Sequence, residues 1–134
     1  MSPRYLLDTN ICIYIAKHHP INVLKRFEQL QQGDVAMSLI THGELMFGAE
    51  KIRQRDKTIE ILHRFTELIP VISPTQQTAE HYGDIRASLE RIGAPIGASD
   101  LWIAAHARSF DLTLVSNNTK KFQRVPNLRL ENWV

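Results

Sequence analysis

The sequence predicts an α/β fold, a three-layer sandwich in which a central parallel sheet of four or five strands is covered by helices on both faces. Two observations support this prediction. Short apolar runs of strand length alternate along the chain with longer segments whose apolar residues recur every three or four positions, the spacing of a helix. The length of 134 residues and the hydrophobic share of 43% suit one core, so we expect a single domain over residues 1–134.

The first half of the chain begins with a predicted strand at Tyr5-Leu6-Leu7, after which Thr9 or Asn10 can cap a helix that runs through Ile15. Apolar spacing then predicts a helix over 21–30, a strand over 35–39, a helix from 41 to about 53, a helix over 59–68 and a strand at 71–72. The helix at 41 is expected to start there because Thr41-His42-Gly43-Glu44 has the form of a capping box.

The second half begins with Ser73-Pro74, a capping residue before a proline, which predicts a helix from there to Gly93. A Gly/Pro loop follows and leads to Ser99, which can cap a helix that starts at Asp100. The remaining predicted elements are a strand over 112–115, a turn at 117–118, one or two helical turns over 119–124 and an edge strand over 128–130.

Composition excludes several classes of protein. The one cysteine, Cys12, cannot build a disulfide framework or a cysteine-rich zinc site within the chain. The N-terminal residues lack the apolar region of a secretion signal, and no apolar stretch approaches the roughly 20 residues that span a bilayer. We therefore expect a cytoplasmic protein with no membrane partner. The net charge of +2 is too small to indicate a dedicated nucleic-acid-binding domain.

Three acidic residues stand where the strands of a parallel sheet end. Asp8 follows the first strand, Glu44 lies one helical turn beyond the second, and Asp100 opens a helix after the Gly/Pro loop. The carboxyl ends of the strands line the ligand crevice of an open α/β sheet, so all three could meet there. Carboxylates held together resist ionisation unless a cation lies between them, and oxygen ligands favour Mg²⁺ or Mn²⁺.

Each acid also has a purely structural interpretation. Asp8 could belong to a turn, Glu44 could complete the capping box, and Asp100 could interact with the dipole of its own helix. The short motifs around the acids favour the functional interpretation. They are Leu7-Asp8-Thr9-Asn10, Gly43-Glu44-Leu45, Gly93-Ala94-Pro95-Ile96-Gly97-Ala98-Ser99-Asp100, and Val115-Ser116-Asn117-Asn118 with Phe122.

In this order the motifs resemble those of the PIN-domain ribonucleases, and within them the VapC toxins of bacterial VapBC toxin–antitoxin modules. The resemblance runs from Tyr5 to Trp133, and the segment from Gly93 to Asp100 is its most specific part. It implies a PIN-like sandwich and a toxic endoribonuclease that hydrolyses structured RNA such as tRNA, leaving a 5′-phosphate and a 3′-hydroxyl.

The resemblance also implies roles for individual residues. Asp8, Glu44 and Asp100 match the family's acidic centre for Mg²⁺ (or Mn²⁺). Asn118 stands where many PIN domains carry a fourth acid, which leaves open whether one or two metal ions bind. Polar residues beside the acids match positions that orient the acids or a metal-bound water, namely Thr9, Asn10, Ser116 and Asn117.

Two kinds of partner follow from the residues and the resemblance. Lys120, Lys121 and Arg124 lie in a segment without acids, so they are candidates for contacts with RNA phosphates, although such runs are often only solvated faces. The resemblance implies a homodimer and a VapB-like antitoxin that lies over the third and fourth helices. Met46 and Phe47 are candidates for its groove, or else core residues.

Other chemistries fit less well. His42-Gly43-Glu44 imitates a deaminase motif but lacks its paired cysteines, and Cys12 has apolar neighbours that indicate an inert buried thiol. A haloacid-dehalogenase phosphatase needs a second aspartate where Asn10 stands, and a receiver domain needs an acidic pair beside Asp8. The alternative from another class is a non-catalytic PIN-like module that binds RNA or a protein.

Overall fold

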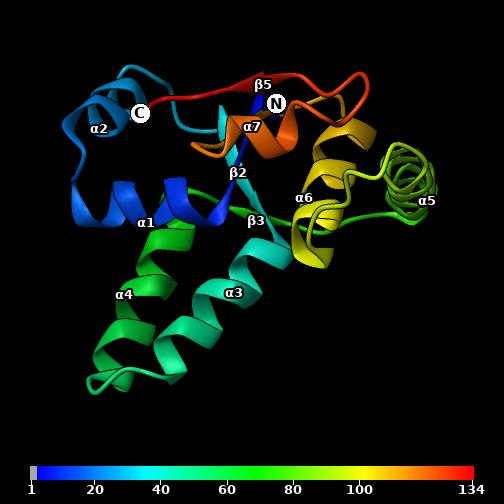
Figure 1. The fold of residues 1–134 in the computed structure, drawn as a ribbon. Coiled ribbons are helices and arrows are strands. Elements are labelled where there is room, and N and C mark those ends of the chain that lie inside the picture. The colour runs from blue at the N-terminus through cyan, green and yellow to red at the C-terminus, as the bar shows by residue number, and fades with distance from the viewer. Residues whose placement is uncertain (1–2) are drawn as a thin grey trace.

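The computed structural model describes residues 3–134 and contains a single parallel sheet with helices on both sides (Figure 1). The sheet has five strands in the order β3-β2-β1-β4-β5, and every neighbouring pair is parallel. This confirms the predicted fold class. The strands are β1 (Tyr5–Leu7), β2 (Val35–Ser38), β3 (Val71–Ile72), β4 (Thr113–Val115) and β5 (Leu130–Glu131).

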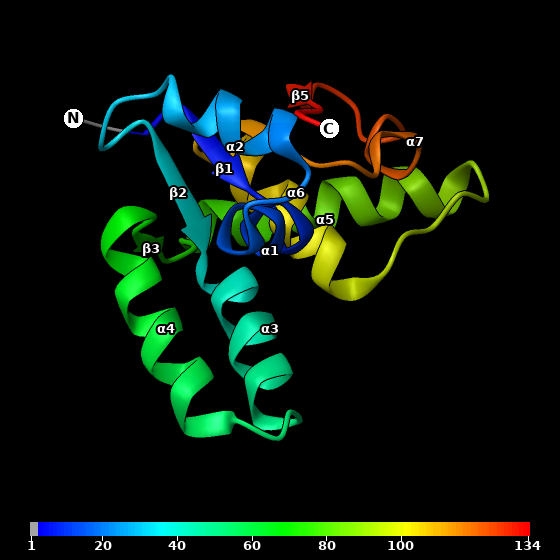
Figure 2. The same cartoon turned by 90° about the vertical axis from the view of Figure 1, so that its left-hand side faces the viewer.

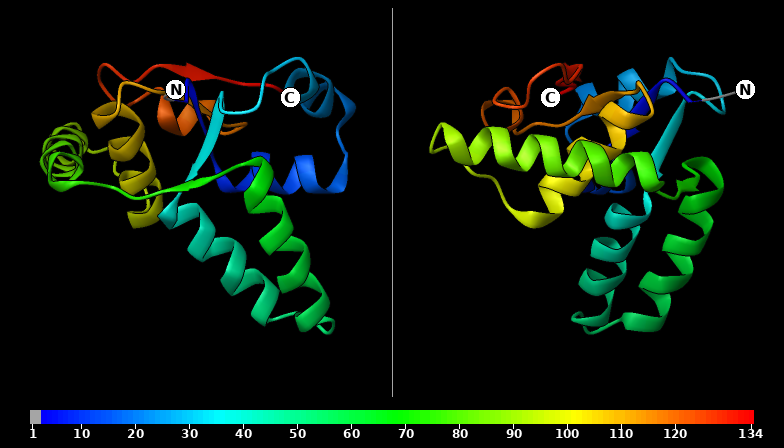
Figure 3. Two further views of the ribbon diagram at one scale, coloured as in Figure 1. Left: turned by 180° about the vertical axis from the view of Figure 1, so that it is seen from behind. Right: turned by 90° about the vertical axis from the view of Figure 1, so that its right-hand side faces the viewer.

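Seven helices connect the strands within the described residues. Helices α1, α2 and α4 lie on one side of the sheet and α5 and α6 on the other, while the α3–α4 hairpin extends away from the sheet (Figures 1 and 2). Seen from behind, α5 is viewed nearly end-on and packs beside α6 (Figure 3). The helices are α1 (Thr9–Lys17), α2 (Ile21–Glu28), α3 (Leu39–Glu50), α4 (Arg55–Leu68), α5 (Gln76–Arg91), α6 (Ala98–Ser109) and α7 (Thr119–Phe122).

The central strand β1 divides two hydrophobic cores. Leu7 packs into the core shared with α1, α2 and α4, whereas Leu6 faces the core shared with α5, α6 and Phe122 of α7. Successive side chains of a strand point to opposite faces, so this alternation follows from the strand geometry. All three residues of β1 are buried, as expected for a central strand of a covered parallel sheet.

The helix starts differ from the predicted ones in a systematic way. Asp8, not Thr9 or Asn10, caps α1, and its carboxylate accepts the backbone N–H of Ile11 at 3.0 Å. Helix α3 begins at Leu39, where the Ser38 hydroxyl accepts the N–H of Ile40 at 3.1 Å. The cap is thus the last residue of the strand at Ser38 and the residue directly after the strand at Asp8, so each helix begins earlier than the predicted capping motif.

Two helices on the other face also begin at unpredicted residues. Helix α5 starts after Thr75 rather than Ser73, and the backbone N–H of Thr75 donates to the Thr78 hydroxyl at 3.1 Å. Helix α6 starts after Gly97, so Ser99 lies inside the helix and does not cap it. Asp100 is consequently in the first turn of α6, where its negative charge interacts favourably with the helix dipole.

Helix α6 is held in place by buried polar groups. The largely buried guanidinium of Arg108 donates to His81 Nδ1 at 2.8 Å, to the Asp84 carboxylate at 2.6 Å and to the carbonyl of Pro126 at 2.9 Å. Two residues earlier, the fully buried His106 bonds the Ser38 hydroxyl through Nδ1 at 2.7 Å. These contacts join α6 to α5 and to the start of α3, so the acids carried by α3 and α6 have a common rigid support.

Among residues 3–134, no helix is both long enough and apolar enough to cross a bilayer.

Candidate active site

The strand order defines where a ligand site is expected in this fold. The chain passes from β1 outward through β2 and β3, then returns to β4 on the opposite side of β1. In open α/β sheets the ligand crevice lies beyond the carboxyl ends of the strands at this change of direction. Here it lies beyond Leu7 of β1 and Val115 of β4, where Asp8 and Ser116 follow. The backbone N–H of Asp8 donates to the carbonyl of Val115 at 3.0 Å.

Asp8 lies at the centre of this edge and is only 6% exposed. Burial raises the pKa of its carboxyl group, and the negative charges of Asp100 and Glu44 raise the pKa further. Hydrogen bonds from the Ser116 hydroxyl and the Ile11 backbone act in the opposite direction and favour the carboxylate. Glu44 and Asp100 are therefore close enough to affect Asp8, although the three acids come from three separate helices.

The other two acids are each engaged by a polar neighbour. The Thr9 hydroxyl donates to Glu44 Oε1 at 2.5 Å, which joins the start of α1 to α3. The Lys121 ammonium of α7 donates to Asp100 Oδ2 at 2.6 Å. In residues 3–134, no three side chains of His, Cys, Asp or Glu converge closely enough to form a metal-binding group. The acids thus surround one site, but they do not meet at a single point.

The polar residues after β1 and β4 form a hydrogen-bonded rim. Asn10 Nδ2 donates to Asn117 Oδ1 at 3.5 Å, and Asn117 Nδ2 donates to the Tyr14 hydroxyl at 3.0 Å. The backbone N–H of Asn118 donates to the Ser116 hydroxyl at 2.9 Å, the same hydroxyl that bonds Asp8. Tyr14 was not predicted, although its position one turn after Asn10 on the same helix face is a signal that could have indicated it.

The three predicted phosphate-binding cations have different surroundings. Lys120 is exposed and makes no ion pair with any residue in 3–134, whereas Lys121 is bonded to Asp100. Arg124 donates to the carbonyl of Pro95 at 3.4 Å, in the loop that leads to Asp100. Of these three cations, Lys120 and Arg124 form no ion pair with Asp8, Glu44 or Asp100, whereas Lys121 is part of the acidic site itself.

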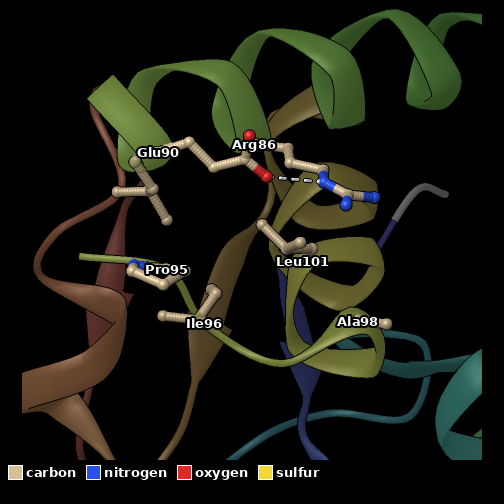
Figure 4. Close-up of a pocket in the computed structure, with 7 residues that line it drawn as sticks. Arg86, Glu90, Pro95, Ile96, Ala98 and Leu101 are labelled. Atoms are coloured by element: carbon tan, nitrogen blue, oxygen red, sulfur yellow. Dashed lines mark hydrogen bonds and ion pairs between the residues drawn. The ribbon is translucent and has the colours of Figure 1, made fainter. Parts of the chain in front are cut away.

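A small cavity lies behind the loop that leads to Asp100. Its volume is about 170 Å³, and the Arg86–Glu90 ion pair of α5 lies across it from Pro95 and Ile96 (Figure 4). Leu101, the residue after Asp100, also lines it. The three acids do not line this cavity, so the candidate site is the crevice at the strand ends.

An apolar groove of about 330 Å³ lies between α1, α3 and α4. Thr9 and Glu44 are among its few polar lining residues, and its apolar lining includes Ile13, Leu45, Gly48, Ile61 and Phe65. The predicted groove residues are not among those that line it: Met46 is packed against the core, and Phe47 is 64% exposed on another side of α3. Leu45 and Gly48 face the groove instead, one position before Met46 and one after Phe47.

Two other predictions can be compared with the structure. Cys12 is fully buried, and burial raises the pKa of its thiol, which confirms an inert side chain. His42 lies in the second turn of α3 rather than at the helix start, because α3 begins earlier than predicted.

Comparison with known proteins shows the family to which this chain belongs. The PIN domain family matches residues 5–128. The chain is 44% identical to Ribonuclease VapC2 of Haemophilus influenzae over 98% of each chain. It is 43% identical to the tRNA(fMet)-specific endonuclease VapC of Shigella flexneri, over 97% of this chain and 98% of that one.

Solved structures agree with the sequence matches. A crystal structure of DNA-bound VapBC from Salmonella typhimurium superimposes with a TM-score of 0.92 at 37% identity, over 100% of both chains. The chain therefore belongs to the PIN-domain family, and within that family to the VapC ribonucleases. This confirms the resemblance that the motifs indicated.

Proposed function

We propose that this chain is the toxic endoribonuclease of a toxin–antitoxin module, a cytoplasmic enzyme of one PIN domain that cuts structured RNA such as tRNA. The observation that carries the proposal is the buried Asp8 at the change of strand direction, with Glu44 and Asp100 near enough to raise its pKa. Relatives named as ribonucleases, one of them specific for tRNA(fMet), support the substrate class.

The donor set fits a divalent metal ion with oxygen ligands. Three carboxylates, two hydroxyls and two amides surround the crevice, and such oxygen donors suit Mg²⁺ or Mn²⁺. Burial raises the pKa of Asp8, the charges of Asp100 and Glu44 raise it further, and a cation would offset both effects. We propose Asp8, Glu44 and Asp100 as its ligands. Bound there, the metal ion would activate a water for hydrolysis and offset charge on the phosphate.

The remaining residues position these acids. Thr9 holds Glu44 at the crevice, and Ser116 orients the Asp8 carboxylate by a hydrogen bond. Asn10 and Asn117 form a rim with amide groups that can hydrogen-bond a phosphate or sugar. Exposed Lys120 and Arg124 extend the site toward the RNA backbone. No side-chain nucleophile is required, because water is the attacking group.

The direct test is cleavage of a purified tRNA mixture with Mg²⁺ or with EDTA. We expect cleavage only with the metal ion, and products with a 5′-phosphate that a 5′-phosphate-dependent exonuclease degrades. Asp8→Asn and Asp100→Asn should each lower cleavage by at least about 100-fold, and the double variant should be little worse, because residues that act as one unit are not additive.

Asp111→Asn is the matched control for these variants. Asp111 is exposed and pairs with Arg129 away from the crevice. If the Asp8 and Asp100 variants cut RNA as well as Asp111→Asn does, the catalytic assignment is wrong. RNA binding that persists without any metal-dependent cleavage would instead favour the alternative, a non-catalytic PIN-like binding module.

We also propose that a VapB-like antitoxin neutralises this enzyme by placing an apolar segment in the groove between α1, α3 and α4. The groove is lined mostly by apolar side chains and includes Glu44, so an occupant would contact one of the three acids. A basic side chain at its end would be attracted to the carboxylates and would compete with the metal ion. VapBC complexes among the structural relatives support this partner, and we expect the toxin to be a homodimer within the complex.

Co-expression with the small open reading frame beside the gene tests this proposal. Tight complex formation and relief of growth inhibition are expected. Inhibition should weaken as Mg²⁺ rises if competition at the acids contributes. A neighbouring product that neither binds nor relieves toxicity would refute the antitoxin proposal, while the nuclease proposal would stand.

A further inference from the structure

Lys121 occupies a position that the proposed reaction does not explain. Its ammonium lies 2.6 Å from Asp100 Oδ2, at the length of a strong charge-assisted hydrogen bond. Both side chains are about one-third exposed, 30% for Lys121 and 29% for Asp100. The pair is therefore neither a freely solvated surface contact nor a buried structural ion pair. It is an ion pair at the edge of the acidic crevice.

The backbone around Lys121 directs the side chain to this place. Phe122, the next residue, is 1% exposed and belongs to the core beneath α6. On the other side, Asn118 is tied to the Ser116 hydroxyl, which also bonds Asp8. The single turn of α7 is thus fixed at both ends by the core and by the acidic site. Lys121 projects from a rigid segment, and its reach to Asp100 does not depend on a mobile loop.

The positive charge of Lys121 lies close to the negative charges of the three acids. Asp8, Glu44 and Asp100 affect one another, and one positive charge bonded to Asp100 reduces their repulsion when no metal ion is bound. The same ammonium occupies one of the two carboxylate oxygens of Asp100. Its positive charge beside that carboxylate also repels a divalent cation, so Lys121 and the cation compete electrostatically for Asp100.

From this geometry we propose that Lys121 is a built-in counter-cation of the catalytic centre, a positioning residue that holds Asp100 in the metal-free enzyme and must leave it before a divalent cation binds. The inference rests on the proposed metal centre and adds a regulation of that centre by a residue of the chain itself. Lys121 thereby raises the metal concentration at which the toxin becomes active.

The test is Mn²⁺ binding to the full-length protein without RNA, measured by calorimetry or by the electron paramagnetic resonance of free Mn²⁺. Lys121→Met removes the charge and keeps a similar side-chain length. We expect it to lower the Kd for Mn²⁺ by about 3- to 5-fold, the upper part of the range expected for a partly exposed ion pair. Lys121→Arg keeps a cation beside Asp100 and should restore the weaker binding.

Lys120→Met is the matched control, since it removes the same charge from the neighbouring residue. The Lys120 side chain is exposed and has no ion pair among the residues described. We expect this variant to bind Mn²⁺ within about twofold of the wild type, because exposed charges are screened. A second readout is thermal unfolding. Without metal, Lys121→Met should lower Tm by about 2–4 °C, and saturating Mn²⁺ should remove the difference.

The possible outcomes separate this inference from the proposed function. Two results together would support the metal centre and the counter-cation role. The wild type binds Mn²⁺ and Asp8→Asn abolishes that binding, and Lys121→Met is the one lysine variant that binds Mn²⁺ more tightly. If Lys121→Met binds Mn²⁺ no more tightly than Lys120→Met, or more weakly than the wild type, the counter-cation role is refuted and the metal centre stands. If the wild type binds no Mn²⁺, or Asp8→Asn binds it equally well, the metal centre and the counter-cation role are both refuted.

Discussion

Acidification should destabilise this protein through His106, because the structure buries that side chain in its neutral form. His106 of α6 is fully buried, packs edge-on against Phe110 and bonds the Ser38 hydroxyl at 2.7 Å. Burial lowers the pKa of its imidazole from 6.5 to about 4, despite an opposing contribution from the Ser73 backbone. Ser38 also caps α3, so protonation of His106 disturbs the start of the helix that carries Glu44.

The sign and size of the effect follow from linkage. The unfolded chain binds a proton at His106 more readily than the folded protein does, so its contribution to stability is complete above pH 6.5 and is lost as the pH falls toward 4. Lowering the pH from about 7.5 to about 5 should therefore reduce the free energy of unfolding by roughly 2 kcal/mol. That is a large part of the total stability of an ordinary domain.

Urea unfolding of the metal-free protein at the two pH values measures this loss. His106→Gln cannot titrate, so its stability should fall by about 2 kcal/mol less than that of the wild type over the same interval. His63→Gln is the matched control, because His63 is exposed on α4. Parallel losses in the wild type and His106→Gln would refute the argument, even if the variant is less stable at every pH.

Three further predictions concern the site and the groove. Asp8→Asn should raise Tm of the metal-free protein near pH 7, because it removes a carboxylate whose pKa is raised by burial. Asparagine can still cap α1, so a lower Tm by calorimetry would contradict this prediction. Ile61→Glu should weaken antitoxin binding by at least about tenfold in a binding titration, whereas Ile92→Glu, exposed outside the groove, should match the wild type. Lys120→Ala and Arg124→Ala should each reduce, by nearly one unit, the slope of the logarithm of the RNA-binding constant against the logarithm of salt concentration. An unchanged slope would show that the residue does not contact the RNA backbone.

The sheet and the acidic site could be predicted because they depend on patterns within short segments. The run at β1 and the alternation at β2 are long enough to predict strands, and the acids after them fall at the sheet edge by topology alone. The starts of the helices were less predictable, because Ser, Thr and Asp residues compete to cap them. At α3 the choice of Ser38 over Thr41 depends on where the backbone of β2 turns, which the order of residues does not reveal.

Contacts between distant side chains were beyond prediction. Lys121 was expected at the RNA backbone with Lys120, yet the two neighbours have different surroundings because only Lys121 reaches Asp100, 21 positions earlier. Phe47 was expected in the groove because it is apolar and lies on the predicted helix. The direction in which it points depends on how α3 packs on α1 and α4, and the packing turns Leu45 and Gly48 to the groove instead.

Gly48 has a consequence for how such a toxin and its proposed antitoxin can diverge. A glycine inside a helix costs about 1 kcal/mol relative to alanine, and a Cβ atom added at Gly48 would meet nothing within 4 Å. The fold alone would therefore gain from a larger residue at this position, but that residue would project into the groove. One substitution would stabilise α3, leave the three acids in place and block the groove. If the proposed antitoxin segment fills this groove, such a substitution would weaken its binding without weakening the toxin fold, and a matching change in the antitoxin would be needed to restore the fit.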